Sequence, residues 1–211
     1  MFLLKLFLFF FSFFCLYCDT PDFDNLKSSK NSIIFLSTPR SGTNLISASL
    51  QTIIKKPIAS LEWEKNFYKF KTHPMYNRLK IPLISEEPFI FRTHGEYKKL
   101  TQIPSEFNKL IFVTRNPKEL LFRKISNQNI KSSQFWVEAE KVLNYQMELF
   151  NTYESWNEEN RMLIFYEDFI NQSVELIPKI LSFIGENDIC YQDYVENKDR
   201  YQSMILKSYS K

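Results

Sequence analysis

The first candidate site in this sequence is a loop around Gly42. The stretch STPRSGTN, residues 37–44, follows the apolar run IIFL, residues 33–36, and precedes the helix-like sequence LISASL. A strand, a glycine-containing turn and a helix form a cradle for an anion, because N–H groups at the helix start face the ligand and the helix dipole favours negative charge. The sequence therefore predicts an anion-binding site at residues 37–44.

Three further residues that suit chemistry stand at or near the ends of other apolar runs. His94 ends the run PFIFRTH, Arg115 ends KLIFVTR, and Tyr166 lies near the end of RMLIFYED. Ligands of parallel α/β sheets bind outside the carboxyl ends of the strands, so residues that follow different strands meet at one edge. We therefore expect these three side chains to gather around the loop at residues 37–44.

The elements that must position these residues follow from the pattern of apolar residues. Continuous apolar runs predict buried strands, at residues 33–37, 88–94, 109–115 and 161–168. Helices are predicted at residues 43–54, from Asn116-Pro117 through Ile125, at residues 134–156 and at residues 174–184. Strands that alternate with helices indicate an α/β fold with a parallel sheet covered on both faces.

Residues 55–87 give no assignable pattern of secondary structure. The segment is rich in aromatic and lysine residues, most of all between Trp63 and Lys80. We expect the part from Trp63 to Lys80 to lie over the pocket at the sheet edge.

Composition limits the number of domains and the class of partner. A length of 211 residues with 44% apolar and 24% charged residues fits one globular domain, and a net charge of +3 is too small to indicate nucleic-acid binding. The loop lacks the G-x-x-x-x-G-K-[ST] pattern, which disfavours a metal-dependent NTPase, and it lacks the cysteine of a cysteine-based phosphatase. Beyond residue 18 the only cysteine is Cys190, so neither an internal disulfide nor a metal cluster is predicted.

The first 18 residues, MFLLKLFLFFFSFFCLYC, form an apolar segment with one charge, Lys5. Such a segment is typical of a secretory signal peptide or an N-terminal signal anchor, and both place the remaining chain outside the cytosol or in a lumen. A lipid-modified Cys18 and a buried core strand are the alternatives. We therefore divide the chain into this segment at 1–18, a polar linker at 19–31 and one domain at 32–211. An uncleaved segment would associate the protein with a membrane.

Four segments of the sequence resemble the motifs of sulfotransferases that use 3′-phosphoadenosine 5′-phosphosulfate (PAPS). STPRSGTN resembles their 5′-phosphosulfate loop, and LIFVTRNPKELLFRK resembles their 3′-phosphate element. FRTH is similar to the K-T-H stretch that carries their catalytic base, and LIFYEDFINQSVELIPKILSFIG is similar to their Y-E-D strand and following helix. The segments occur in the family's order. The resemblance implies an α/β three-layer sandwich of the P-loop NTPase-like type, with a central parallel sheet of about four to five strands.

The resemblance also implies roles for individual residues. Arg40 would neutralise the oxygen that bridges phosphate and sulfate, and His94 would accept the proton of the acceptor's hydroxyl, so these two are the catalytic candidates. The residues implied to bind the co-substrate, besides Arg40, are Ser41, Gly42, Thr43 and Asn44 at the 5′-phosphate, Arg115 at the 3′-phosphate and Tyr166 near the adenine.

Three features depart from the family's pattern. Arg123 stands eight residues after Arg115, where the family usually has a serine for the 3′-phosphate; its guanidinium would also bind a phosphate, and Ser126 is a candidate shifted substitute. Leu45 stands where cytosolic members place a Trp against the adenine. The C-terminal stretch contains no R-K-G segment of the kind that closes over the 3′-phosphate in many members.

The leading hypothesis is an enzyme that moves a sulfuryl group from PAPS to a hydroxyl or amine of a carbohydrate or small-molecule acceptor. The reaction would be an in-line displacement without a metal ion. The alternative is a catalytically inactive relative that acts as a secreted or membrane-anchored binding protein. A nucleotide kinase on the same sheet is a third hypothesis, which the missing G-K-[ST] disfavours.

Overall fold

The computed structural model of the 211-residue chain describes the central part of the sequence. The described residues are 32–56, 58–64, 67–72, 90–94, 100, 103–128 and 131–187, with 192, 195, 196, 199 and 203. The predicted N-terminal segment at 1–18 and the linker at 19–31 lie outside this set. Within it, no helix has the length and apolar character that a membrane span requires.

A six-stranded sheet forms the centre of the fold, in the order β3-β2-β4-β1-β5-β6. The strands are β1 (Ile33–Ser37), β2 (Ile58–Glu64), β3 (Phe67–Thr72), β4 (Ile90–Thr93), β5 (Lys109–Thr114) and β6 (Arg161–Phe165). Each neighbouring pair is parallel except β2 and β3, which pair antiparallel at one edge. Five strands thus form the parallel sheet, and the predicted fold class is confirmed.

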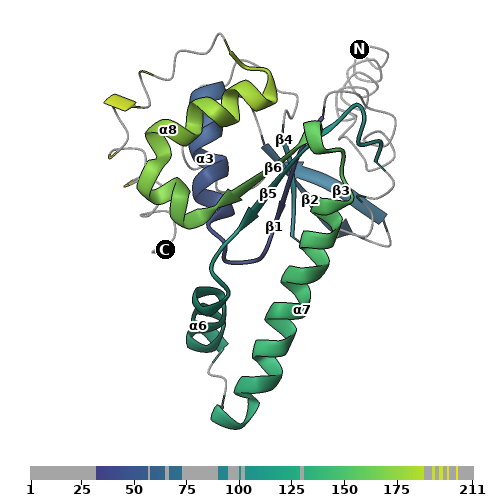
Figure 1. The fold of residues 1–211 in the computed structure, drawn as a ribbon, viewed down its shortest axis with the longest axis vertical. Coiled ribbons are helices and arrows are strands. Elements are labelled where there is room, and N and C mark those ends of the chain that lie inside the picture. Colours follow the sequence, from purple (N-terminus) through teal and green to yellow (C-terminus); the bar gives the residue numbers. More distant parts are fainter. Residues whose placement is uncertain are drawn as a thin grey trace, which may run out of the picture.

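Helices cover both faces of the sheet, as Figure 1 shows. The helices are α3 (Thr43–Ile54), α6 (Pro117–Gln128), α7 (Phe135–Glu154) and α8 (Tyr166–Ile184), with short 3-10 helices η1 (Ser132–Gln134) and η2 (Glu158–Asn160). Alternate residues of the fully buried strand β1 point to opposite faces. Ile33 and Phe35 pack in a cluster with α3 and α8, whereas Ile34 and Leu36 pack in a second cluster with α7. The central strand therefore joins two apolar cores into one domain.

Two predicted helix starts are confirmed in detail. Helix α3 spans Thr43–Ile54, as its apolar pattern predicted. Helix α6 begins at Pro117, where the side chain of Asn116 accepts a hydrogen bond of 2.9 Å from the N–H of Lys118. Because proline has no N–H to satisfy and asparagine supplies an acceptor, this pair is well suited to a helix start. The sharp start of α6 holds Arg115 directly at the end of β5.

The segment at 55–87, which shows no assignable pattern, supplies β2 and β3. Their pairing matches Ala59 with Thr72 and Glu64 with Phe67, so the connection between the two strands is short. Part of the segment Trp63–Lys80, which we expected over the pocket, therefore forms the outer edge of the sheet. Residues 73–80 lie outside the described residues.

The last predicted strand ends earlier than its apolar pattern indicates. Strand β6 stops at Phe165, and Tyr166 is the first residue of α8. The backbone of Gln172 is non-helical (φ −130°, ψ 29°), so α8 consists of two helical parts, the second of which matches the helix predicted from Val174. This early helix start places Tyr166 at the carboxyl edge of the sheet, beside the loop around Gly42.

Candidate active site

The loop around Gly42 is held in shape by its own hydrogen bonds. The N–H and the hydroxyl of Ser41 both donate to the carbonyl oxygen of Thr38, at 3.2 and 2.7 Å, and the same hydroxyl lies 3.1 Å from Thr43 Oγ1. Arg40 and Gly42 have left-handed backbone conformations (φ 71° and 80°), which turn the chain sharply from β1 into α3. The amide of Ser41 thus shapes the loop.

The start of α3 leaves two N–H groups without an acceptor in the helix. The carbonyl oxygen of Gly42 accepts bonds from the N–H groups of Leu45 and Ile46, at 2.9 and 3.2 Å. The N–H groups of Thr43 and Asn44, the first two residues of the helix, have no acceptor within it. Together with the helix dipole these two N–H groups can hold an anion. The set predicted from the sequence was residues 41–44, and the N–H of Ser41 instead donates to the carbonyl oxygen of Thr38.

Gly42 lies against the ring of Tyr166 so closely that no other residue fits. A Cβ atom on residue 42 would fall 1.9 Å from Tyr166 Cδ2 and 2.1 Å from Tyr166 Cε2. The positive φ of this residue adds a second reason for glycine. The first turn of α8 and the first turn of α3 therefore meet at this contact.

Arg115 lies against the same tyrosine ring. Its guanidinium carbon is 4.3 Å from the centroid of Tyr166, and its side chain is 10% exposed. Carboxylate oxygens of Glu119 and Glu167 lie 3.6 Å from its nitrogens, which is too long for hydrogen bonds, and its Nε is buried without a partner. The guanidinium is thus positioned by charge and stacking, with donor capacity left for an anion.

Tyr166 joins the loop and the guanidinium into one site. Gly42, just before α3, is in contact with the ring, and so is Arg115, just after β5. A ligand with two anionic groups can therefore contact both the start of α3 and Arg115 across this ring. Of the residues expected to gather around the loop at 37–44, Tyr166 contacts Gly42 and Arg115 contacts Tyr166.

His94 follows β4 and is held by the end of β1. Its Nδ1 is 2.9 Å from Ser37 Oγ and 3.2 Å from the carbonyl oxygen of Ser37. Because a carbonyl oxygen only accepts, Nδ1 carries the proton and Nε2 is the basic nitrogen. Nε2 lies 3.5 Å from Nη2 of Arg92.

The surroundings of His94 keep its ring neutral. Burial, and to a lesser extent the positive charge of Arg92, lower the pKa of His94 from 6.5 to about 4. At neutral pH the Nε2 lone pair is therefore free of a proton, as a general base requires.

Arg92 is a site residue that the sequence analysis missed. Its side chain is buried, at 5% exposure, and Nη1 donates to the side-chain oxygen of Asn44 at the start of α3. It thus connects His94 with the anion-binding helix start. The sequence could have indicated that Arg92 lies beside His94, because residues i and i+2 of a strand share a face.

The pKa of His94 predicts how stability depends on pH. The unfolded chain takes up a proton at His94 below about pH 6.5, whereas the folded chain does so only near pH 4. Above about pH 6.5, His94 therefore does not make the free energy of unfolding depend on pH. As pH falls from 6.5 to 4, His94 lowers the free energy of unfolding by up to about 3 kcal/mol.

Urea unfolding at several pH values, on the wild type and on His94→Asn, measures this dependence. Asn retains a donor for the carbonyl of Ser37 but does not titrate, so the difference between the two proteins isolates His94. We expect the stability of the wild type relative to the variant to fall between pH 6.5 and 4. A constant difference over that range would contradict the lowered pKa.

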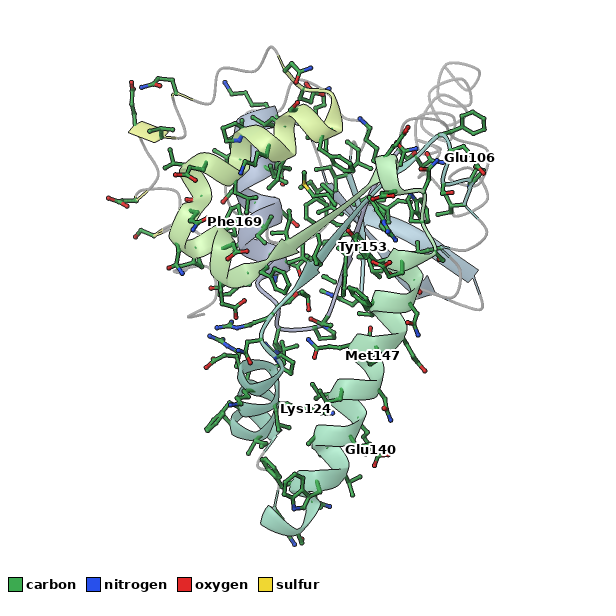
Figure 2. All side chains as sticks on the ribbon, in the orientation of Figure 1. Glu106, Lys124, Glu140, Met147, Tyr153 and Phe169 are labelled. Atoms are coloured by element: carbon green, nitrogen blue, oxygen red, sulfur yellow. The ribbon has the colours of Figure 1, made fainter. Side chains whose placement is uncertain are left out.

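A cavity of about 770 Å³ opens beside the loop, on the side of α6 and α7. Its wall consists of loop residues Thr38, Pro39 and Arg40, α6 residues Leu120 and Lys124, and α7 residues Lys141, Val142, Tyr145 and Gln146. Figure 2 labels Lys124 on α6, on the side that faces α7. The cavity shares Arg40 with the anion-binding loop, so a second ligand placed there would lie next to the anion.

Arg123, Ser126 and Leu45 lie at the points where the sequence departs from the family's pattern. Arg123 is exposed on α6, and within the described residues no contact joins it to Gly42, Arg115 or Tyr166. Ser126 is also exposed and donates its hydroxyl to the carbonyl oxygen of Phe122 in its own helix, at 2.9 Å. Leu45 is buried in the core between α3 and α8. Among the described residues no group of three or more His, Cys, Asp or Glu side chains has the arrangement of a metal site.

Comparison with known proteins places the chain in a family. A sequence search of curated proteins found no match. Solved structures with the same fold include mouse sulfotransferase SULT7A1 complexed with PAP (TM-score 0.54, 20% identity, covering 85% of this chain and 68% of that one). A retinol dehydratase in complex with androsterone and the inactive cofactor PAP has a TM-score of 0.55 at 14% identity, covering 86% and 66%.

A third structure, the sulfotransferase domain from the curacin biosynthetic pathway, has a TM-score of 0.51 at 14% identity and covers 74% of each chain. At these identities the likenesses show the fold. The family is shown by a sequence model described as the sulfotransferase domain, which matches residues 30–203. This protein therefore belongs to the sulfotransferase domain family.

Proposed function

We propose that this sulfotransferase moves a sulfuryl group from PAPS to a hydroxyl or amine of a carbohydrate or small-molecule acceptor, without a metal ion. The reaction class, sulfuryl transfer, follows from the family. The acceptor class and the metal-free route are the proposal. They are supported by the described site and, for a small-molecule acceptor, by solved neighbours that hold retinol or androsterone.

The contact of Tyr166 with both Gly42 and Arg115 carries the proposal for PAPS. This co-substrate has anionic groups on the 5′ and the 3′ side of one nucleoside, and the site offers helix N–H groups at one end and a guanidinium at the other. The guanidinium of Arg115 and the N–H groups of Thr43 and Asn44 supply donors for these groups. The aromatic ring of Tyr166 between them suits a nucleoside. The residues present therefore fit the two ends of PAPS.

Two side chains near the loop are assigned to the chemistry. PAPS supplies the sulfuryl group and the leaving phosphate when it is bound. Arg40, at the junction of loop and cavity, would place positive charge where negative charge develops on the transferred group. His94 would accept the proton from the acceptor's hydroxyl at Nε2, while Ser37 holds Nδ1 in the protonated form.

Positive charge at this edge of the sheet supports a route without metal. Arg40, Arg92 and Arg115 all lie at the carboxyl ends of β1, β4 and β5. Transfer of a sulfuryl group, like that of a phosphoryl group, depends on positioning and on charge stabilisation more than on covalent catalysis. Arg40 and Arg92 can supply that charge at the loop, while Arg115 is assigned to the 3′-phosphate.

Titration with 3′-phosphoadenosine 5′-phosphate (PAP) and a transfer assay test the proposal together. We expect heat of PAP binding by calorimetry, and transfer of label from radiolabelled PAPS to at least one member of a panel of sugars and phenols. Transfer should be unchanged by EDTA. Absence of PAP binding at millimolar ligand would contradict the nucleotide site, and PAP binding without transfer would support the inactive alternative.

The N-terminal segment adds a proposal about location. The apolar residues 1–18 support export or membrane anchoring, with the domain at 32–211 on the non-cytosolic side. Fractionation of cells that express the full chain, followed by protease protection of the domain, tests this. A cytosolic, protease-accessible protein would contradict it.

A further inference from the structure

The cavity beside the loop has an unbalanced charge. Three of its nine wall residues are cations, Arg40, Lys124 and Lys141, and none is an acid. The ammonium groups of Lys124 and Lys141 both pair with one carboxylate, that of Glu138, at 2.5 and 2.7 Å. One negative charge thus faces two positive charges, and Arg40 adds a third. The cavity wall keeps a net positive charge.

The cavity wall carries polar and apolar groups beside its charged side chains. Thr38 contributes to the wall, although its own hydroxyl is buried. Tyr145 and Gln146 add polar groups to the α7 wall, while Leu120 and Val142 add apolar surface. The wall thus combines donors and apolar contacts, as small-molecule sites usually do.

The cavity is next to the proposed chemistry but apart from the nucleotide contacts. Thr38 directly follows Ser37, which holds the ring of His94, and Arg40 belongs to both the loop and the cavity. Gly42, Tyr166 and Arg115 are not part of the cavity wall. A molecule in the cavity would therefore approach the loop from the side of α6 and α7, next to the group that the loop holds.

We propose that this cavity binds the acceptor, and that the acceptor carries a negative charge of its own, as an acidic or already sulfated sugar does. The inference rests on the proposed sulfotransferase function and narrows its acceptor class. The acceptor's anionic group lies against Lys124 and Lys141, while its hydroxyl faces the loop. A volume of about 770 Å³ accommodates a molecule of one to two sugar rings.

Matched glycosides test the charge of the acceptor. The probes are 4-nitrophenyl β-D-glucuronide, 4-nitrophenyl β-D-glucoside 6-sulfate and the neutral 4-nitrophenyl β-D-glucoside. We expect at least one anionic glycoside to have a kcat/KM about tenfold above the neutral one at low ionic strength, with the preference reduced in about 0.5 M salt. The anionic probe with the higher kcat/KM identifies the preferred acidic group, a carboxylate or a sulfate ester.

Substitutions at Lys141 test the cavity wall. This lysine is 61% exposed, so its replacement leaves the fold intact, and Lys141→Gln and Lys141→Glu remove one and two units of charge. We expect the ratio of anionic to neutral kcat/KM to fall about threefold and about tenfold, respectively. Lys179→Gln makes the same change on the exposed surface of α8, and we expect it to leave the ratio unchanged.

The outcomes separate this inference from the proposed function. A wild type that shows no anionic preference, or a Lys141→Glu variant that keeps the wild-type ratio, overturns the inference while label transfer still supports a sulfotransferase. If no probe is turned over, calorimetry of the three glycosides on the PAP-loaded protein decides. Tighter binding of an anionic glycoside supports the inference, and equal or absent binding overturns it. Failure of PAP itself to bind overturns the proposed function.

Discussion

Replacement of His94 by alanine should lower turnover by about 10²–10⁴-fold while PAP affinity stays within a few-fold of wild type. The imidazole holds an unprotonated Nε2 at neutral pH, because burial and Arg92 lower its pKa to about 4. Neither ring nitrogen contacts Gly42, Arg115 or Tyr166 in the described site. Loss of the ring therefore removes a proton acceptor and leaves the nucleotide contacts in place.

The asparagine variant separates chemistry from packing. His94→Asn keeps a donor toward the carbonyl oxygen of Ser37 but has no nitrogen at the Nε2 position. We expect His94→Asn and His94→Ala to lose turnover to a similar extent in single-turnover assays, with PAP affinity measured by calorimetry as the control. Wild-type turnover in either variant would show that another group accepts the proton.

Replacement of Arg115 by methionine should weaken PAP binding by about 100-fold, which corresponds to ~3 kcal/mol. The guanidinium is 10% exposed and its Nε has no hydrogen-bond partner, so a phosphate bound there gains charge-assisted bonds that water does not screen strongly. Methionine keeps most of the length of the chain against the ring of Tyr166. The loss should therefore report the charge and its donors.

Adenosine 5′-phosphate provides the control for Arg115→Met, because it lacks the 3′-phosphate. We expect its affinity to change by a few-fold only. Arg123→Met makes the same change on the exposed surface of α6 and measures directly the contribution that the sequence assigned to Arg123. A larger loss of PAP affinity at residue 123 than at residue 115 would contradict the assignment of the main phosphate contact to Arg115.

The parts of the fold that the sequence predicted best are those in which local pattern and burial agree. Strand β1 is buried along its whole length, and a strand buried on both faces must be a continuous apolar run. The start of α6 is equally local, because Asn116 and Pro117 satisfy the helix end without help from distant residues. Since the ends of parallel strands meet at one edge, these elements also placed Arg115 and the loop together.

The parts that were missed depend on contacts across the chain. The sequence of β2, IASLEWE, alternates polar and apolar residues after Ala59, which is typical of a strand. The next two residues, Lys65 and Asn66, are not a typical turn pair of a β-hairpin, so no local signal indicated the pairing with β3. The start of α8 at Tyr166 carries no strong cap residue before it, since Phe165 supplies no side-chain acceptor. The sequence pattern indicated only that Arg92 belongs to a strand. Its contacts with Asn44 and His94 identify it as a site residue.

One side chain on α7, that of Gln146, contacts both the cavity and the end of β5. Gln146 lines the cavity, and its amide donates to the carbonyl oxygen of Arg115 at 3.0 Å and lies 3.3 Å from Thr114 Oγ1. The backbone of Arg115, to which we assign the 3′-phosphate, is therefore hydrogen-bonded to a side chain of the cavity wall. We expect a ligand that displaces Gln146 from the wall to disturb this backbone as well.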